Sequence, residues 1–482
     1  MKKDNTKLHI IIAFIIYALF AFVIPVSEPM TKEGLRTLGV LFMTIYLWMN
    51  VSVGWPSVLC IFMFGTTGIC SASIVLIKSW GYGMTSFMIF CFLLNYAMKE
   101  TGLSRRLALW FVTRKFVKGK PWLTMTTFLF SVVVVSLFVT SSAVGAMFLS
   151  IAEEIFENTG YTEEDDLTHA TVASIAWLAN AGQGMTPMSH AVILLVLGIF
   201  AETFGFEVSV LSFSAAGIAY GLVFFILFMI VFRFVMHPDV EKIRNLDIDY
   251  LRSTVPPMDK KERWVTICFV AMILMWVTPD ILVFVPFLEP LGLFLKSLGN
   301  YLPAFLMVAI LCVVQVDKKP VLDLKEASRN INWISVYMMA TLGCMAAVVQ
   351  MPEGGITEWI SSKVGVLLGN MPAMLFVVLS IAFILTLTNF VSNTVCGVLF
   401  SAIVPIAMAI PGVNAMALGL CIMAASNYGQ ATPAACPVTG MVASTKWVTP
   451  KYLMKYGWFI STAALIAIVC VAYPVWSIIF PA

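Results

Sequence analysis

The sequence predicts an all-α integral membrane protein, with about 11 transmembrane helices plus two re-entrant helical hairpins in two inverted-topology repeats. Composition is the first reason: 60% of the 482 residues are hydrophobic, 11% are charged and the mean hydropathy is +0.94. The second reason is that apolar runs of bilayer-spanning length recur from end to end. The third is a polar motif that occurs once in each half. These features leave no stretch for a separate soluble catalytic domain.

The first half is expected to begin with a retained N-terminal helix. Its apolar run is longer than that of a usual signal peptide and lacks an obvious Ala-x-Ala cleavage site. The remaining elements follow the later apolar runs. We expect crossings at 8–26, 37–50, 53–70, 84–99 and 212–236, a helical hairpin at 121–157 and a broken helix at 167–203.

The second half repeats this order of elements. We expect crossings at 264–285, 301–316, 333–349 and 455–479, a second hairpin at 372–408 and a second broken helix at 413–445. The expected division of the chain is an N-terminal helix at 1–33, a first repeat at 34–236, a cytoplasmic linker at 237–263 and a second repeat at 264–482.

The distribution of Lys and Arg predicts the orientation. Basic clusters at 105–120, 242–263, 318–329 and 446–451 share one side of the membrane only if both hairpins enter and leave on the same face. This places the N-terminus in the cytoplasm and the C-terminus outside, in the cell inner membrane or plasma membrane. The helices that open the two repeats then run in opposite directions, so the repeats are inverted.

The duplicated motif places small polar residues within apolar sequence. The first copy, Phe138–Phe148, reads FVTSSAVGAMF, and the second, Phe390–Phe400, reads FVSNTVCGVLF. Each is followed by a second shared segment, GQGMTP from Gly182 and GQATP from Gly429. Any one of these residues alone is better explained by helix packing. Repeated in order, they indicate a transport site where the two repeats meet.

Interrupted helices in hydrocarbon need partners for their backbone groups, since each unsatisfied group costs several kcal/mol. Carbonyls and Ser, Thr or Asn oxygens at a hairpin tip suit a hard cation such as sodium. The N–H groups that open the next half-helix favour an anion. The candidate residues are Thr140, Ser141, Ser142, Gly184, Met185, Thr186 and Pro187 in the first half, and Ser392, Asn393, Thr394, Ala431, Thr432 and Pro433 in the second.

These residues resemble the motifs of the divalent anion/sodium symporter family. Ser392-Asn393-Thr394 matches the Ser-Asn-Thr motif of that family outright, while Thr186-Pro187 and Thr432-Pro433 match its Thr-Pro motifs in part. The resemblance covers nearly the whole chain. It implies a homodimer with scaffold and elevator-type transport domains, and sodium-coupled uptake of di- or tricarboxylates.

The resemblance also implies roles for individual residues. It assigns a first sodium site to Thr140, Ser141, Gly184 and Met185, and a second to Ser392, Asn393 and Ala431. It assigns substrate binding to Ser141, Ser142, Asn393, Thr394, Thr186, Pro187, Ser189, Thr432 and Pro433. The expected ion is Na+, and the expected partners are a small anionic substrate and the lipid bilayer, with no nucleic acid.

The first motif departs from the family pattern. Ser141 stands where the family has Asn, so a side-chain amide is missing there. His190 follows the first Thr-Pro motif, either as a packed histidine or as an anion donor or proton-sensitive group. The leading hypothesis is sodium-coupled symport of a small dianion such as a C4-dicarboxylate. The alternative is an exchanger of dicarboxylates or other anions with a degenerate first sodium site.

An enzyme is not expected. The apolar runs contain no His-x-x-x-His, Glu-x-x-His or Gly-x-Ser-x-Gly pattern that would supply a metal centre or a nucleophile at depth. The sequence leaves the anion open among succinate, malate, fumarate, citrate, sulfate and a sulfonate.

Overall fold

The computed structural model describes most of the chain. The described residues are 6–52, 54–248, 250, 256–283, 285–297, 299, 301–349, 351–356, 358–359, 362, 371–391, 393–432 and 435–481. Ser392 and Pro433, both predicted site residues, therefore lie outside the described residues.

Helices make up almost all of the described first half. They are α1 (Thr6–Ala18, extended by a π-turn at Leu19–Val23), α2 (Lys32–Asn50), α3 (Gly54–Phe64), α4 (Ala72–Ser79), α5 (Gly83–Glu100), α6 (Leu103–Val112), α7 (Pro121–Ser136), α8 (Ser141–Thr159), α9 (Asp166–Gly182), α10 (Ala191–Phe204) and α11 (Val210–Ile230). Local sequence explains several of their starts. Thr31 and Ser209 accept hydrogen bonds from the first turns of α2 and α11, and Pro121 opens α7 where no backbone donor is needed.

The second half is also helical, with one short β-hairpin. Its helices are α13 (Lys260–Leu282), α14 (Glu289–Ser297), α15 (Leu302–Val313), α16 (Leu324–Arg329), α17 (Trp333–Val349), α19 (Ala373–Leu387), α20 (Asn393–Val398), α21 (Phe400–Met408), α22 (Ala415–Ser426), α23 (Pro437–Ala443), α24 (Pro450–Ala467) and α25 (Tyr473–Ile479). Strand β1 (Gln315–Val316) pairs antiparallel with β2 (Lys319–Pro320). Asp259, Asn414 and Thr449 cap α13, α22 and α24.

Some helix bounds differ from the expected crossings. The helix expected at 53–70 ends at Phe64, and Gly68 in the following turn takes a φ of +88°, a left-handed conformation that glycine adopts readily. The crossing expected at 301–316 gives way to the β-hairpin after Val313. Helices α4, α6 and α14 were not expected, because they are short or carry charges and so do not stand out as apolar runs.

Length and apolar composition together single out the helices that could cross a membrane. Among the described residues, four helical segments are long and apolar enough to cross a membrane: Thr6–Val23, Val210–Met236, Lys260–Pro279 and Pro450–Ile479. A bent pair, α14 with α15, passes the same test with a 76° bend. Shorter apolar helices of 10–17 residues include α7 of the first hairpin and α19 of the second. The expected number of about 11 crossings stays a prediction.

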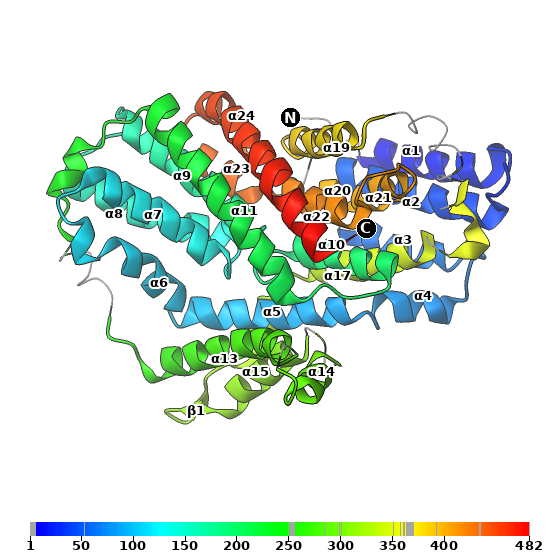
Figure 1. The fold of residues 1–482 in the computed structure, drawn as a ribbon, viewed down its shortest axis with the longest axis horizontal. Coiled ribbons are helices and arrows are strands. Elements are labelled where there is room, and N and C mark those ends of the chain that lie inside the picture. Colours follow the sequence, from blue (N-terminus) through cyan, green and yellow to red (C-terminus); the bar gives the residue numbers. More distant parts are fainter. Residues whose placement is uncertain are drawn as a thin grey trace.

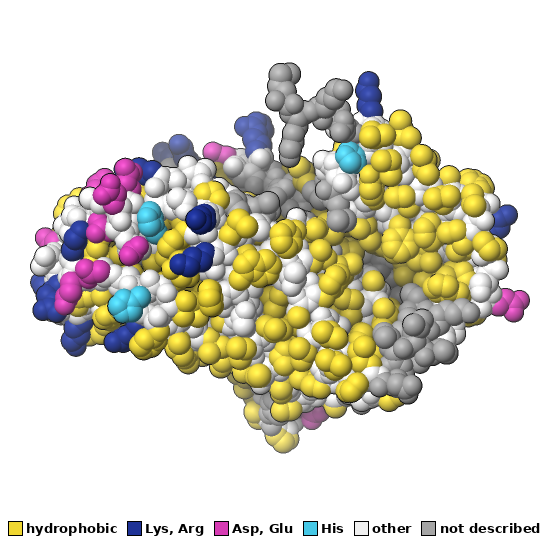
Figure 2. All heavy atoms as spheres, turned by 90° about the horizontal axis from the view of Figure 1, so that it is seen from above, with side chains coloured by type: hydrophobic (Ala, Val, Ile, Leu, Met, Phe, Trp, Pro, Cys, Tyr) yellow, Lys and Arg dark blue, Asp and Glu magenta, His cyan; other side chains and the backbone are white. Residues whose placement is uncertain are grey.

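The helices are arranged along one long axis. Helices α7, α8 and α9 lie toward one end of the molecule and α1 to α4 toward the other, with α5 running between them (Figure 1). Helices α13, α14 and α15 form a layer on one side of α5, which α13 and α15 contact. Charged side chains gather at the α7–α9 end, while hydrophobic side chains cover much of the remaining face (Figure 2).

The two halves of the chain interlock through the duplicated motif. Helix α8 packs against α23, and α20 packs against α10. At each contact the glycine of the motif allows a close approach to a valine. A Cβ on Gly145 would lie 2.4 Å from Val438 Cγ2, and one on Gly397 would lie 2.8 Å from Val192 Cγ1. Each hairpin is therefore held against the second part of the other half's interrupted helix.

Candidate transport site

Both copies of the motif form the turn of a helical hairpin. In the first half α7 ends at Ser136 and α8 begins at Ser141, with Thr140 as an extended N-cap residue. In the second half α19 ends at Leu387 and α20 begins at Asn393. Ser141 and Asn393 thus hold the same position, the first residue of the helix that follows each tip.

The segments GQGMTP and GQATP lie where two helices are interrupted. Helix α9 ends at Gly182 and α10 begins at Ala191, while α22 ends at Ser426 and α23 begins at Pro437. Gln183 to Ser189 are all buried, so this irregular backbone lies within the protein, as it must at membrane depth.

One threonine fastens each interrupted helix to the neighbouring hairpin. The Thr186 hydroxyl donates a hydrogen bond to the backbone carbonyl of Leu137, and the Thr432 hydroxyl donates to that of Asn389. Leu137 and Asn389 occupy the same position in the two hairpins, three residues before Thr140 and Ser392. The two Thr-Pro motifs therefore make equivalent contacts.

In the second half, a side-chain amide adds further hydrogen bonds between the interrupted helix and the hairpin. Asn389 Oδ1 accepts hydrogen bonds from the backbone N–H groups of Gln430, over 2.8 Å, and Ala431, over 2.5 Å. Leu137 has no such group. In the first half, the N–H groups of Gly184 and Met185 instead bond to Ala181 and Gly182 in a local turn. The second interrupted segment is thus held more firmly to its tip.

A cavity of about 630 Å³ lies where the two tips meet. The tips and interrupted helices supply one part of its lining, which comprises Val139, Thr140, Ser141, Ser142, Ala143, Gln183, Ser189, His190, Val192, Asn393, Thr394, Ala435, Cys436 and Pro437. Helix α5 and the residues around the start of α17 supply the other part, which comprises Phe92, Asn95, Tyr96, Lys99, Asn330, Asn332, Ile334, Ser335 and Met338.

The chemistry of this lining is polar and almost neutral. Among its described residues, amides and hydroxyls predominate, Lys99 is the one Lys or Arg, and no Asp or Glu is present. Helices α8 and α10 both begin at the cavity, so their N-terminal backbone N–H groups and dipoles add partial positive charge. The cavity therefore favours an anion over a cation of the same size.

The structure brings together some of the predicted site residues and not others. Thr140, Ser141, Ser142, Ser189, Asn393 and Thr394 line the cavity, as does His190. Thr186 and Thr432 do not appear in its lining, because their hydroxyls face the hairpin carbonyls. Gly184, Met185, Pro187 and Ala431 are buried behind the cavity wall, where the carbonyl of Gly184 accepts a bond from the Tyr220 hydroxyl.

Several residues at the site were missed from the sequence. Asn180 and Asn389 are fully buried amides next to the tips, and Gln183 lines the cavity. An Asn or Gln inside an apolar run was the signal available for each of them. Asn330, Asn332 and Ser335 gave no such signal, because they lie in a polar segment outside the motif.

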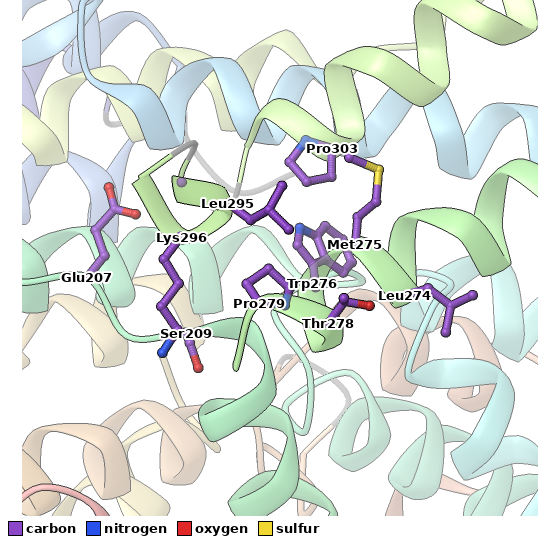
Figure 3. Close-up of a pocket in the computed structure, with 11 residues that line it drawn as sticks. Glu207, Ser209, Leu274, Met275, Trp276, Thr278, Pro279, Leu295, Lys296 and Pro303 are labelled. Atoms are coloured by element: carbon purple, nitrogen blue, oxygen red, sulfur yellow. The ribbon is translucent and has the colours of Figure 1, made fainter. Parts of the chain in front are cut away.

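A second cavity, of about 340 Å³, lies away from the tips. It is enclosed by the connection from α10 to α11, the C-terminal part of α13, and helices α14 and α15, and it contains none of the predicted site residues. Glu207, Trp276 and Lys296 are part of its lining (Figure 3). It shares no residue with the tip cavity.

A mostly helical fold in which two interrupted helices and two hairpins enclose a polar cavity is that of a multi-pass membrane transporter, not of an enzyme. Residues 2–481 match the family model described as the sodium:sulfate symporter transmembrane region, and the chain belongs to that family. The resemblance to divalent anion/sodium symporters drawn from the motifs is therefore confirmed.

Two curated relatives span most of the chain. The sodium-dependent dicarboxylate transporter SdcS of Staphylococcus saprophyticus is 21% identical over 500 residues, covering 98% of this chain and 93% of its own length. SdcS of Staphylococcus aureus strain USA300 is 21% identical over 425 residues, covering 83% of this chain and 78% of its own.

Two solved structures share the fold. The YdaH transporter of Alcanivorax borkumensis aligns with a TM-score of 0.59 at 11% identity, over 99% of both chains. MtrF of Neisseria gonorrhoeae, described with a class of antimetabolite efflux pumps, aligns with a TM-score of 0.53 at 14% identity, over 97% of this chain and 93% of its own. At these identities the likeness concerns the fold alone.

Proposed function

We propose that this protein is a sodium-coupled symporter of a small dianion, with a C4-dicarboxylate as the best candidate. The observation that carries the proposal is the tip cavity, whose described lining combines hydroxyls, amides and helix N-termini with no acidic side chain. Its volume lies within the range of small-molecule sites. The S. saprophyticus and S. aureus relatives, named as sodium-dependent dicarboxylate transporters, support the same ion and substrate class.

The anion would be held mainly by neutral donors. Ser141, Ser142, Asn393 and Thr394 offer hydroxyl and amide groups at the starts of two helices, where the backbone N–H groups also favour negative charge. Ser189 adds a hydroxyl from the interrupted helix. With a single Lys among the described lining residues, a dianion would need bound cations to balance its charge, so binding without sodium should be weak.

The cations would sit at the two tips, where oxygen ligands are plentiful. We assign a first sodium site to Thr140, Ser141, Gly184 and Met185, and a second to Ser392, Asn393 and Ala431. For the second site, the Asn393 side-chain oxygen already faces the Thr388 hydroxyl, which donates to it over 2.9 Å. A sodium ion there would take the buried Asn393 oxygen into its ligand shell.

The movement would be of the elevator type, between the two parts of the cavity lining. The tips and interrupted helices would move as a transport domain against a scaffold that includes α5 and α17. The same proposal includes two inverted repeats, a homodimer, an N-terminus in the cytoplasm and a C-terminus outside the cell. The matching contacts of Thr186 and Thr432 support the repeats.

One observation favours a second candidate, an exchanger of dicarboxylates or other anions. Ser141 lacks the amide that Asn393 supplies at the other tip, so the first cation site has a hydroxyl oxygen on its helix in place of the amide oxygen. An exchanger with a degenerate first site would need less sodium or none. The two candidates differ in whether net uptake occurs into vesicles that contain no anion.

A thermal-shift screen of the purified protein tests the proposal. Small mono-, di- and tricarboxylates, sulfate and a sulfonate are each added with sodium and with potassium. A ligand that binds the folded state raises the unfolding temperature, and the rise grows with the logarithm of its concentration above the dissociation constant. We expect stabilisation by dicarboxylates in sodium and not in potassium. Equal stabilisation in both salts would overturn sodium coupling, and stabilisation by none of the anions would overturn the substrate class.

A further inference from the structure

The two hairpin tips differ in the residue that opens the helix after the tip. Asn393 opens α20 with a side-chain amide whose nitrogen donates to Asn180 Oδ1 over 3.2 Å. Ser141 opens α8 at the equivalent position and has no amide to offer. The Ser141 backbone N–H nevertheless has a side-chain partner, which comes from another helix.

That partner is Gln183, at the end of α9. Its Oε1 accepts a hydrogen bond from the Ser141 N–H over 3.1 Å, and its Nε2 donates to Asn180 Oδ1 over 2.9 Å. Gln183 is 2% exposed and lines the tip cavity, as Asn393 does. Gln183 and Asn393 therefore donate to the same oxygen atom, one from each half of the chain.

The orientation of Asn180 is fixed by its other contact. Asn180 Nδ2 donates to the backbone carbonyl of Gly429 over 3.2 Å, so its Oδ1 must face the two amide nitrogens. The reverse orientation would oppose N–H groups to N–H groups and bring two oxygens together. Because Asn180 is fully buried, its Nδ2 would be left unsatisfied without the Gly429 carbonyl, and its Oδ1 would keep one of two partners if either amide were lost.

We propose that Gln183 supplies, from the interrupted helix, the amide that the first tip lacks. It is a positioning residue: it caps the first turn of α8, orders the tip around the first cation site, and joins that tip through Asn180 to Asn393 at the second. Sodium binding at the two tips is thereby coupled. This inference rests on the proposed function.

Sodium-driven uptake of labelled succinate into proteoliposomes tests this role in three variants. Gln183→Met keeps the size of the side chain and removes both hydrogen bonds, and Gln183→Asn keeps an amide that is too short to reach. The third variant adds Ser141→Asn to Gln183→Met, which restores an amide at the tip itself. Ser174→Ala is the control, since Ser174 is a buried residue of α9 whose hydroxyl bonds only to Ala170 O in its own helix.

We expect Gln183→Met and Gln183→Asn to raise the sodium concentration for half-maximal uptake by about tenfold and to lower its Hill coefficient. Ser141→Asn should recover most of this loss, and Ser174→Ala should leave both values unchanged. A wild-type sodium response in both Gln183 variants, or a loss that Ser141→Asn does not reduce, would overturn the inference. Wild-type uptake that ignores sodium would instead overturn the proposed function, so the two failures are distinguishable.

Discussion

Asn393 Nδ2 donates a hydrogen bond to Asn180 Oδ1 over 3.2 Å, and this contact joins an amide of the second hairpin tip to a helix of the first half. The oxygen of the same Asn393 amide and the carbonyl of Ser426 both lie within hydrogen-bonding distance of the Thr388 hydroxyl, which has one proton to share between them. Both ends of the Asn393 side chain are therefore committed, and the tip of the second hairpin has one defined geometry at the cavity.

Asn393→Ala should abolish transport and sodium-dependent ligand binding while the protein remains folded. The substitution removes the proposed sodium and substrate ligand, whereas Asn180 Oδ1 keeps its bond from Gln183 and the Thr388 hydroxyl keeps the carbonyl of Ser426. Uptake of labelled dicarboxylate and thermal shift with sodium measure the two effects. Asn414→Ala is the control, because Asn414 is a buried amide that caps α22 away from the cavity. Unchanged uptake in Asn393→Ala would show that the second cation site is assigned wrongly.

Thr186→Val and Thr432→Val should loosen the interrupted helices from the hairpins. Each substitution keeps the shape of the side chain and removes a hydrogen bond to a hairpin carbonyl, which costs about 1–3 kcal/mol where the carbonyl stays buried. Thr186→Val should have the larger effect on sodium affinity, because the second segment is also held by Asn389. Sodium titrations of ligand binding compare the two variants. Equal effects would mean that the Asn389 contacts add nothing to the second segment.

The ion pair between Lys78 and Glu202 should stabilise the conformation seen in this structure. Lys78 Nζ on α4 lies 3.0 Å from Glu202 Oε2 on α10, and both side chains are partly exposed. If α10 moves with the transport domain, the pair must break. Its loss in Glu202→Gln should shift the conformational equilibrium by up to about fivefold, since pairs of this kind contribute about 1 kcal/mol or less.

Cys436 offers a direct measurement of that shift, because it lines the tip cavity. In a background where the exposed Cys470 is replaced, a membrane-impermeant thiol reagent should modify Cys436 more slowly in Glu202→Gln, from the side to which the cavity opens. Glu241→Gln, which removes an exposed pair with Arg244, serves as the control and should have no effect. An identical modification rate in Glu202→Gln and the parent would exclude the ion pair as a determinant of the equilibrium.

Asp165, at the charged end of the molecule, should make the free energy of unfolding slightly dependent on pH. The Thr162 N–H, at 2.7 Å, and Lys242 lower the pKa of Asp165 from its ordinary value, against an opposing effect of partial burial. The resulting stabilisation is present above the unfolded pKa of about 4 and is lost as the pH falls through the folded value. Asp165→Asn should therefore lower the free energy of unfolding at pH 7 by about 1 kcal/mol or less, and the unfolding temperature slightly with it.

Unfolding temperatures of the wild type and Asp165→Asn, measured from pH 7 down to pH 3, give the test. The difference between them should shrink in the acidic part of this range, because the Asp165 carboxylate takes up a proton there, first in the unfolded chain. A difference that stays constant with pH would mean that Asp165 stabilises the fold by packing and not by its charge. Asp247→Asn, which removes another surface carboxylate, is the control: the effect of Asp165→Asn should exceed that of Asp247→Asn.

The sequence predicted the interrupted elements better than their contacts. Ser, Thr and Asn inside apolar runs located both tips, because such groups need partners in hydrocarbon. Helix α7 falls within the expected segment 121–157, and α8 runs past its end to Thr159. Contacts such as that of Gln183 with Ser141, or of Asn180 with Asn393, join positions far apart in the chain, and no local pattern encodes which amide reaches which tip.

The wall opposite the tips could not be predicted for a different reason. Asn330 and Asn332 lie in a polar turn between α16 and α17 that resembles any surface loop. Helix α6 carries Arg105 and Arg106, so it was interpreted as part of a basic loop, whereas Arg106 forms an ion pair with the buried Glu262 on α13. Charged residues that pair across helices are indistinguishable in sequence from those that face water.

Uptake into proteoliposomes measures sodium-coupled symport most directly. Vesicles without internal anion receive labelled succinate under an inward sodium gradient, and matched vesicles receive it in potassium. Sodium-coupled symport predicts that the wild type concentrates succinate in sodium and shows only background uptake in potassium. For Asn393→Ala it predicts background uptake in both salts. Uptake that is equal in the two salts, or that occurs only when the vesicles contain an unlabelled dianion, would contradict it.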